Sequence, residues 1–316
     1  MSEVLEFDTV ILGGGPAGLS AGIYAARATG NIAIVDVSMF GGQPSNYLEL
    51  ENYPAFPIVG GYDLMEKMEE HADKFGVNKF PMEEIQKIDL ISTPKIIETL
   101  THTFKAKSVI IATGAQPKKL GVKGEKEFLG RGVSYCAICD GAFYRDKTVA
   151  VVGGGNAALE EAMYLTKFAT KVYVIHRRNE FRADKIVQNL AFKNEKLECV
   201  YDTVVNEING EDTVKSLVIE NVKTNETSTL NVDGIFPYIG FLPNTDLING
   251  QVEQDSNGFI ITDETMKTSI DGVFAAGDVR KTPLRQVITA ASDGAIAAVY
   301  AGRYIETLEK ITAKTV

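Results

Sequence analysis

The feature that most constrains this chain is a duplication, in which two segments open with an apolar run, a glycine-rich turn and a helical stretch. The first segment covers residues 8–36 with its turn at 13–18, and the second covers 148–176 with its turn at 153–158. In both, another apolar run follows the helical stretch. Strand, turn, helix and strand in this order form a βαβ unit, which implies parallel strands joined by a helical crossover. We therefore predict an α/β fold with two Rossmann-like dinucleotide-binding domains.

Linker signals divide the chain, whose 316 residues are enough for about two domains of about 150 residues each. Gly and Pro cluster near 114–117 and again near 240–244. The last stretch, 258–305, holds strands and then a small-residue helix that begins near Arg285. This stretch is too small for a complete domain, so we expect it to return and finish the first one.

The first glycine-rich turn has the sequence Gly13-Gly14-Gly15-Pro16-Ala17-Gly18 and is followed by a helical stretch over 19–28. Such a motif alone is a weak signal, because an ordinary turn also uses Gly. Here it follows a strand, opens a helix and is followed by an acid, Asp36, after the next strand. Gly13 permits the tight turn, Gly15 lets the backbone approach a pyrophosphate, and Gly18 lets helix and strand pack closely. Asp36 would accept a hydrogen bond from a ribose hydroxyl.

The second turn, Gly153-Gly154-Gly155-Asn156-Ala157-Ala158, opens a helical stretch that we expect to reach Phe168. His176-Arg177-Arg178 and then Arg182 stand where an acid would contact an unmodified ribose. Clustered guanidinium groups pair with a 2′-phosphate, so this site is predicted to bind NADP. The alternative is a solvated basic face. Two dinucleotide sites in one chain suggest electron transfer between cofactors, with FAD bound permanently and NADPH visiting.

Composition excludes several classes of protein. The formal net charge of -10 argues against nucleic acid or an anionic membrane surface as the main partner. No apolar run reaches the roughly 20 residues that span a bilayer. The acidic N-terminal residues lack the basic and apolar regions of a signal peptide. We therefore expect a cytoplasmic protein.

The three cysteines need separate explanations. Cys136 and Cys139 have the spacing of a zinc knuckle, but a structural zinc site needs about four ligands, and neither Cys199 nor the scattered histidines offer a second pair. Two unrelated structural thiols, or a redox-active disulfide, remain as alternatives, and the βαβ-rich setting favours the disulfide. Asp140 follows directly and is either a proton donor or a plain turn residue. Cys199, in an apolar stretch, is predicted to be a buried structural thiol.

Taken together, these motifs closely resemble the low-molecular-weight thioredoxin reductases over nearly the whole chain. The matching segments, specific in this combination and order, are 13–18, Gly41-Gly42-Gln43, Glu51-Asn52-Tyr53-Pro54, Ala112-Thr113-Gly114-Ala115, Cys136-Ala137-Ile138-Cys139-Asp140-Gly141, His176-Arg177-Arg178 with Phe181-Arg182-Ala183, Ala275-Ala276-Gly277-Asp278 and Arg285-Gln286.

The resemblance implies an FAD domain made of residues 1–117 and 245–316, with an NADPH domain inserted at 118–244. It also implies the residues of the FAD site, which are Gly13, Gly15, Pro16, Ala17, Gly18, Asp36, Gly41, Gly42, Gln43, Asn52, Ala112, Thr113, Gly114, Gly277, Asp278, Arg285 and Gln286. The NADP site would consist of Gly153, Gly155, Asn156, Ala157, Glu160, His176, Arg177, Arg178 and Arg182. No metal site is expected.

For the chemistry, the resemblance implies NADPH-dependent reduction of thioredoxin by a homodimer whose NADPH domain rotates. Cys139 would face the flavin, Cys136 would attack the thioredoxin disulfide, and Asp140 would donate a proton. The chain departs from the family pattern at Pro44-Ser45-Asn46, where Leu-Thr-Thr is usual, and at Ala157, where Ser or Thr is common.

Two other functions are compatible with parts of this pattern. One keeps the fold and changes the acceptor, to another thiol protein, a quinone, ferredoxin or a peroxidase system. The other is a nucleotide-binding sensor or scaffold without turnover, against which the intact Cys136–Cys139 pair argues.

Overall fold

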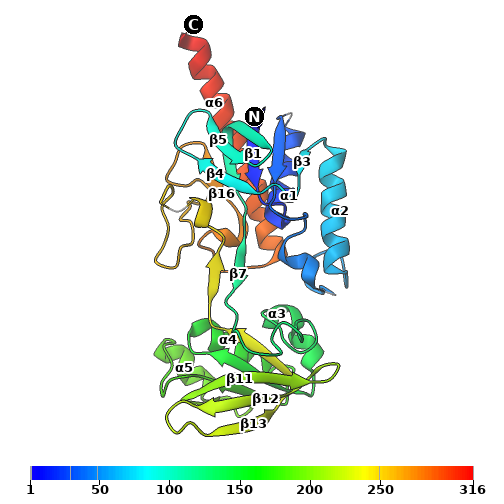
Figure 1. Cartoon of the computed structure of the whole chain (residues 1–316), viewed down its shortest axis with the longest axis vertical. Coiled ribbons are helices and arrows are strands. Elements are labelled where there is room, and N and C mark those ends of the chain that lie inside the picture. The colour runs from blue at the N-terminus through cyan, green and yellow to red at the C-terminus, as the bar shows by residue number, and fades with distance from the viewer. Residues whose placement is uncertain (1, 29, 48, 249, 316) are drawn as a thin grey trace. The chain divides into compact units, whose positions relative to one another are not determined.

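The protein is described by a computed structural model, which covers residues 2–28, 30–47, 49–248 and 250–315. The chain forms two compact units. Met1–Gln116 and Leu242–Val316 make up the first, and Pro117–Phe241 the second (Figure 1). Both units combine a parallel sheet with helices, so the predicted α/β class is confirmed.

The first unit contains both ends of the chain. Its elements before the crossing to the second unit are β1 (Glu3–Leu12), α1 (Pro16–Arg27), β2 (Ile32–Val35), the short 3-10 helix η1 (Gln43–Asn46), α2 (Gly61–Lys74), β3 (Asn78–Phe80), β4 (Ile85–Asp89), β5 (Lys95–Thr99), β6 (His102–Ile111) and β7 (Ala115–Pro117). After the return they are β15 (Phe241–Pro243), η3 (Asp246–Ile248), β16 (Val273–Ala275), η4 (Gly277–Val279) and α6 (Val287–Thr315). The connecting strands β7 and β15 pair with each other.

The main sheet of the first unit has the order β3-β2-β1-β6-β5-β4, with β16 also paired to β6. Strands β3, β2, β1, β6 and β16 are parallel, whereas β5 and β4 continue from β6 as an antiparallel ladder. Strand β6 serves both parts, since its residues 103–106 pair with β5 and its residues 109–111 pair with β16. The late strand β16 therefore completes the sheet that the N-terminal strands begin.

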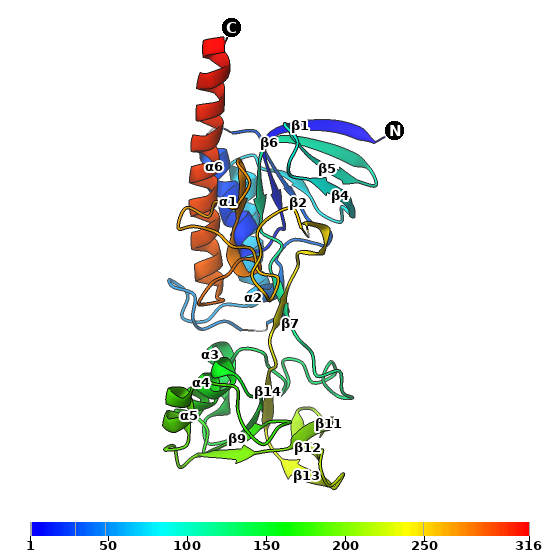
Figure 2. The ribbon, with the colours of Figure 1, turned by 90° about the vertical axis from the view of Figure 1, so that its left-hand side faces the viewer.

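Two cores cover the two faces of this sheet, because alternate residues of a strand point to opposite faces. Ile11 and Ile34 pack with Leu19 of α1 and Ala297 of α6 on one face. Val10 and Ile111 pack with Ile97 of β5 on the other. Helices α1 and α6 lie side by side, as both views show (Figure 2).

The second unit repeats this layering. Its elements are α3 (Ala137–Asp140), η2 (Gly141–Tyr144), β8 (Thr148–Gly153), α4 (Asn156–Leu165), β9 (Lys171–Ile175), α5 (Lys185–Ala191), β10 (Leu197–Val200), β11 (Thr203–Gly210), β12 (Val214–Asn221), β13 (Thr227–Asn231) and β14 (Gly234–Tyr238). The parallel sheet has the order β10-β9-β8-β14, and β11, β12 and β13 form a separate antiparallel sheet.

The parallel sheet of the second unit lies between helices and the antiparallel sheet (Figure 2). Val151 and Val174 face α4 and α5, where they pack with Leu159. Ala150 and Val152 face the opposite way and pack with Leu217 of β12. A buried parallel sheet covered on both faces explains why β8 and β9 are almost uninterrupted apolar runs.

Helix ends differ from the sequence prediction by a few residues. Helix α1 starts at Pro16, because Gly15 is its extended N-cap and Pro fits the first helical position. Helix α4 ends at Leu165, three residues before Phe168, and α6 starts at Val287. Among the residues that the structure describes, no helix is both long and apolar enough to cross a bilayer.

Candidate active site

The first glycine-rich turn ends in a helix N-terminus that has no side-chain cap. The N-cap of α1 is Gly15, and no side-chain cap hydrogen bond is found there among the residues that the structure describes. The position that a Cβ of Gly15 would occupy is open, since the nearest atom is the Cα of Gly42 at 3.8 Å. Free N–H donors at the positive end of a helix, next to open space, form a site for an anionic group.

The other glycines of this turn are required by packing. Gly13 has φ of 109°, and an added Cβ would overlap the carbonyl oxygen of Ala112. A Cβ on Gly18 would overlap the carbonyl oxygen of Gly13. The turn can therefore lie this close to β6 and to α1 only with Gly at both positions.

The predicted acid and the second glycine pair both contact this turn. Asp36 directly follows β2, and its Oδ2 accepts a hydrogen bond from the Gly14 N–H at 2.6 Å, while Oδ1 accepts from the Ser38 N–H at 2.8 Å. Gly41 donates its N–H to the carbonyl oxygen of Gly14 at 2.9 Å. The segment with Gly41, Gly42 and Gln43 therefore borders the N-terminus of α1.

Five of the remaining predicted residues of the first unit come from the same edge of the sheet. Ala112, Thr113 and Gly114 follow β6, and Gly277 and Asp278 follow β16. The Ala276 N–H donates to the carbonyl oxygen of Ile111 at 2.9 Å, which joins the two segments. Asn52 and Gln286 are joined by a side-chain hydrogen bond of 3.0 Å. Open α/β sheets bind ligands at the carboxyl ends of their strands, so the segments after β6 and β16 border one candidate site.

Sequence reasoning missed a buried ion pair that supports this edge. Arg280 donates from Nε and Nη2 to the two carboxylate oxygens of Asp293, at 2.7 and 3.0 Å. The same carboxylate accepts the Gly277 N–H at 3.1 Å. The sequence signal that could have revealed this ion pair is Asp293, an acid among the small residues of α6. Burial raises the pKa of Asp278 to about 6, although the charge of Arg285 opposes this.

The second glycine-rich turn repeats the first in geometry. Gly155 is the extended N-cap of α4, again without a side-chain cap, and no atom lies within 4 Å of its Cβ position. Asn156 and Asp184 exchange two hydrogen bonds of 2.7 Å, and the Arg182 N–H donates to the carbonyl oxygen of Gly154 at 2.7 Å. These bonds bring the arginine segment to the N-terminal end of α4, where Ala157 and Glu160 are exposed.

Three exposed arginines border this turn. Arg177 and Arg178 follow β9, and Arg182 lies four residues further on. None of the three forms an ion pair with another residue that the structure describes. Their guanidinium groups therefore offer bidentate donors for an anion beside the N-terminus of α4.

His176 differs from the arginines beside it because its ring is buried. A Cβ on Gly154 would overlap that ring, which also packs against Phe181 with the ring centres 5.3 Å apart. Burial lowers the pKa of His176, and the neighbouring arginines lower it further. The ring of His176 therefore packs against the turn, and its place in the NADP site stays a prediction.

Cys136 and Cys139 form a disulfide at the start of α3. Cys136 is the N-cap of this short helix, and its Sγ accepts a hydrogen bond from the Cys139 N–H at 3.1 Å. Both cysteines are half-buried. A sulfur at a helix N-terminus is stabilised as a thiolate, which is the reactive form of cysteine. The disulfide therefore agrees with the redox-active alternative of the sequence analysis. Among the described residues, no group of at least three His, Cys, Asp or Glu side chains could hold a metal ion.

Asp140 lies at the end of this helix and is held close to the pair. Burial raises the pKa of its carboxyl group, while a hydrogen bond from Ser134 opposes the rise. The Ser134 hydroxyl also accepts the Cys136 N–H at 3.1 Å. Ser134, which sequence reasoning missed, therefore links the acid to the cysteine turn. A carboxyl that keeps its proton at higher pH is suited to proton transfer.

Cys199, predicted to be a buried structural thiol, is half-buried in β10, the edge strand of its sheet. Burial raises the pKa of its thiol, and its side chain is hydrogen-bonded to Tyr201. An edge strand has a neighbour on one side only, which explains the greater exposure. The raised pKa favours the unreactive thiol form.

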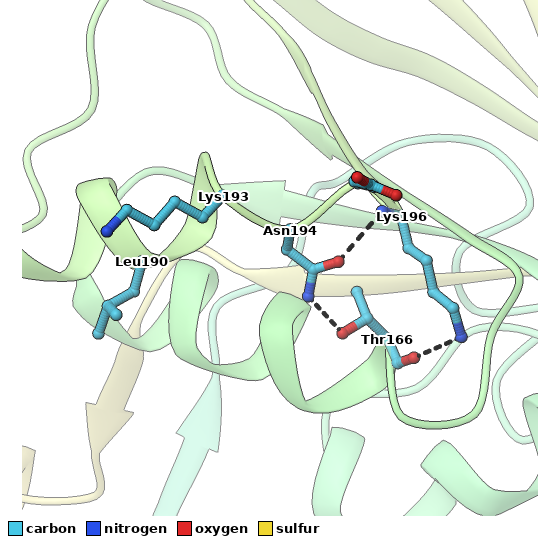
Figure 3. A pocket seen from close by; sticks show the side chains of 6 residues that line it. Thr166, Leu190, Lys193, Asn194 and Lys196 are labelled. Carbon is cyan, nitrogen blue, oxygen red and sulfur yellow. Dashed lines mark hydrogen bonds between the residues drawn. The ribbon is translucent and has the colours of Figure 1, made fainter.

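A cavity of about 510 Å³ lies at the opposite end of α4 from the glycine-rich turn (Figure 3). Its polar groups bond one another, since Lys196 donates to the carbonyl oxygens of Thr166 and Ala169 at 2.9 and 3.1 Å. Asn194 donates to the Thr166 hydroxyl at 2.8 Å. These bonds satisfy carbonyl groups at the helix C-terminus, so the cavity has a structural explanation.

Two glycine-rich βαβ units and a Cys-x-x-Cys disulfide define the class of nucleotide-dependent disulfide oxidoreductases. The sequence profile of the pyridine nucleotide-disulphide oxidoreductases matches residues 7–294. The chain is 47% identical over 307 residues to a thioredoxin reductase of Peptoclostridium acidaminophilum, covering 95% of this chain and 97% of that one. It is 43% identical over 316 residues to the thioredoxin reductase of Bacillus subtilis, covering 100% and 99%.

A solved structure gives the same result. The thioredoxin reductase of Streptococcus pyogenes matches with a TM-score of 0.90 at 47% identity, covering 96% of this chain and 99% of that one. The chain therefore belongs to the pyridine nucleotide-disulphide oxidoreductase family, among the thioredoxin reductases.

Proposed function

We propose that this enzyme reduces the disulfide of thioredoxin with electrons from NADPH, through FAD and the Cys136–Cys139 pair. The observation that carries the proposal is the disulfide at the N-terminus of α3, on the same unit as a nucleotide-type turn bordered by exposed arginines. The high identity to thioredoxin reductases over nearly the whole chain supports the choice of acceptor.

FAD is proposed to bind to the first unit, with its pyrophosphate at the N-terminus of α1 and a ribose at Asp36. The open Cβ position of Gly15 and the free N–H donors of the helix fit that group. Asp36 already accepts the Gly14 N–H and keeps lone pairs for a ribose hydroxyl. The segments after β6 and β16, together with Arg285 and Gln286, would complete the site.

NADPH is proposed to bind to the second unit, with its pyrophosphate at Gly155 and its 2′-phosphate at Arg177, Arg178 and Arg182. The exposed guanidinium groups fit a phosphate that carries nearly two negative charges. Ala157, exposed on the first turn of α4, offers no hydroxyl for a further hydrogen bond. We assign the FAD domain to residues 1–117 and 245–316 and the NADPH domain to residues 118–244.

When bound, the flavin would accept a hydride from NADPH and supply two electrons to the disulfide. Reduction breaks the Cys136–Cys139 bond and leaves a thiolate and a thiol after proton uptake. The Cys136 thiolate attacks the thioredoxin disulfide and forms a mixed disulfide, and Cys139 then attacks Cys136. This restores the intramolecular bond and releases thioredoxin as a dithiol. Asp140, with its raised pKa, would hold the proton that moves to and from the cysteines.

Replacement of Cys136 tests the proposal. Cys136→Ser should lower thioredoxin reduction by about 10³-fold or more while NADPH still bleaches the flavin, because only the attacking sulfur is lost. Cys199→Ser is the matched control and should keep full activity. A Cys136→Ser enzyme that reduced thioredoxin at the wild-type rate would overturn the assignment.

Further properties belong to the same proposal. The enzyme is proposed to be a homodimer. It is also proposed to act in the cytoplasm, where disulfides are usually transient and catalytic because thiols are kept reduced. A thiol protein other than thioredoxin is the alternative acceptor, and the same assay with that protein in place of thioredoxin separates the two.

A further inference from the structure

We propose that Arg280 and Asp293 form a positioning pair for FAD, because together they hold the turn that carries Asp278 against the N-terminal end of α1. The inference rests on the proposed function, since it takes the first unit to bind FAD. All of the residues involved belong to that unit. The pair acts through the turn and not through a contact of its own with the cofactor.

The turn after β16 is packed tightly between two helices. Gly277 has φ of 75°, and an added Cβ would lie 2.9 Å from the Cβ of Ala17 and 3.4 Å from the Cβ of Ala290. Ala17 is the second residue of α1, and Ala290 belongs to α6. The turn therefore contacts the helix end at which the pyrophosphate is proposed to bind. A shift of this turn would move Asp278, the next residue, relative to that helix end.

Asp293 holds the turn through the backbone. Its Oδ2 accepts the Gly277 N–H at 3.1 Å, and this bond is buried. The carboxylate belongs to α6, and the residue is only 7% exposed. A buried N–H that lost its acceptor would be costly, so the bond fixes the direction of the peptide group that precedes Asp278.

Arg280 in turn fixes the carboxylate. Its Nε donates to Oδ2 of Asp293 at 2.7 Å, and its Nη2 donates to Oδ1 at 3.0 Å. Both side chains are mostly buried, with 15% and 10% of their surfaces exposed. A planar guanidinium that donates two parallel bonds leaves a carboxylate one orientation. The oxygen that accepts the Gly277 N–H is therefore fixed from its other side.

The bonds close a ring around the turn. The Arg280 N–H donates to the carbonyl oxygen of Gly277 at 3.2 Å. Gly277 is thus bonded at its N–H to Asp293 and at its carbonyl group to the backbone of Arg280. Since the side chains of Arg280 and Asp293 are joined to each other, neither end of the Gly277 residue can turn without breaking a bond of the ring.

The helix that carries Asp293 is itself held on α1. The Ser20 hydroxyl of α1 donates to the carbonyl oxygen of Ala291 at 2.7 Å. Gly294 lies so close to α1 that an added Cβ would overlap the carbonyl oxygen of Ala17. Asp293 stands between these two contacts in the sequence. Its carboxylate therefore relates the turn to the N-terminal end of α1.

Charge explains why a pair is used here. A buried ion pair adds little net stability compared with apolar residues of the same volume, so stability alone is a weak explanation for it. A lone Asp293 carboxylate would place a negative charge on a turn that contacts α1 beside a proposed pyrophosphate site, and like charges repel. Arg280 neutralises that carboxylate. The pair thus supplies a strong acceptor for the Gly277 N–H without opposing an anionic cofactor.

The test measures the affinity of the full-length enzyme for FAD. The FAD-loaded enzyme is diluted in series, and the Kd is obtained from the fluorescence of the released flavin. Arg280→Gln leaves the carboxylate unneutralised, and Asp293→Asn leaves the guanidinium without its partner. Each should raise the Kd by about 10- to 100-fold. The double variant keeps an amide donor and an oxygen acceptor without either charge, so its Kd should return to within about 3-fold of wild type.

Glu83→Gln is the matched control. Glu83 forms a mostly buried pair with His102 at 2.7 Å in the same unit. His102 is the first residue of β6, whereas the candidate site follows the last residue of that strand. This variant breaks a comparable pair at the far end of the strand, so it should leave the Kd for FAD within about 2-fold of wild type.

Three results would overturn the inference. The first is a wild-type Kd in both single variants, and the second is a double variant whose loss equals the product of the two single losses, as expected for independent structural damage. In both cases the wild-type enzyme still binds FAD and the proposed function stands. A wild-type enzyme that bound no FAD would instead overturn the proposed function and this inference with it.

Discussion

At the residue scale, the second unit surrounds one disulfide with groups that each control a proton or a charge. Asp140 and Glu161 are both partly buried carboxyls with a raised pKa, and Ser134 and Tyr238 each accept a hydrogen bond from the backbone of the cysteine turn. The arginines of the nucleotide turn are exposed by comparison. The partly buried carboxyls keep their protons to a higher pH, because burial disfavours the charged form, whereas the exposed arginines stay charged.

The arginine pair gives a prediction about cofactor choice. Arg177→Ala with Arg178→Ala removes charge-assisted bonds to the 2′-phosphate, which NADH lacks. We expect the KM for NADPH to rise about 10- to 100-fold and the KM for NADH to change by less than about 3-fold. Steady-state kinetics with both nucleotides measure this, with Lys193→Ala as an exposed-cation control. Equal effects on NADPH and NADH would contradict the assignment.

Glu161 gives a prediction about stability and pH. Folding raises its pKa from 4.5 to about 7, so between these values the folded state binds more protons than the unfolded chain. The free energy of unfolding therefore falls as pH rises through this window. After allowance for partial solvent screening, the loss is about 1–2 kcal/mol.

Glu161→Gln lacks this titration. Urea unfolding at about pH 5 and about pH 8 should show that the variant gains about 1–2 kcal/mol relative to wild type at the higher pH. If the two proteins differed by the same amount at both values, Glu161 would not titrate in this range.

At this scale, a site residue could be predicted from sequence where the local backbone conformation requires its residue type. Gly13, Gly15 and Gly155 could be predicted, because a tight turn before a helix restricts the residue type at those positions. Tyr238 and Glu161 could not. Tyr238 meets Ala137, 101 residues away in the sequence, only after β14 and α3 have packed, and Glu161 lies on a third element, α4.

At the element scale, close contact between α1 and α6 fixes the edge of the first unit. Gly294 of α6 lies directly on α1, where an added Cβ would overlap the carbonyl oxygen of Ala17 and lie 3.0 Å from the Ala21 nitrogen. The helix after β16 therefore packs on the helix that starts at the glycine-rich turn. This contact joins the C-terminal segment to the N-terminal βαβ unit.

Gly294→Ala should accordingly push the two helices apart. Overpacking of this kind costs about 1–3 kcal/mol, and we expect a lower Tm and weaker retention of FAD. Gly302→Ala, on the same helix with no atom within 4 Å of the new Cβ, is the control and should be neutral or slightly stabilising. Thermal unfolding followed by flavin fluorescence measures both. Equal Tm values for the two variants would refute the packing argument.

The βαβ units could be predicted from sequence because apolar runs of fully buried parallel strands stand out against their polar surroundings. The antiparallel ladders could not be predicted in the same way. Strand β13 (Thr227–Asn231) is mostly exposed, and its polar residues carry no periodic signal. Pairing with β12 makes it a strand, and that contact is not visible in local sequence.

At the scale of the whole molecule, the chain leaves its first unit, forms the second, and returns to add β16 and α6 to the first. The glycine-rich turn of each unit stands at the N-terminus of a helix after its first parallel strand. The duplication in the sequence therefore corresponds to two similar sites, and the disulfide belongs to the second unit. The central claim is that electrons from NADPH reach this disulfide.

An anaerobic titration of the FAD-loaded enzyme with NADPH, with thiols counted by alkylation at each step, tests that claim. Wild type should take up two electron pairs for each FAD, one for the flavin and one for the disulfide, and should gain two thiols. Cys199→Ser should do the same, whereas the double variant Cys136→Ser with Cys139→Ser should take up one. A wild-type enzyme that took up one electron pair and kept Cys136 and Cys139 oxidised would contradict the account.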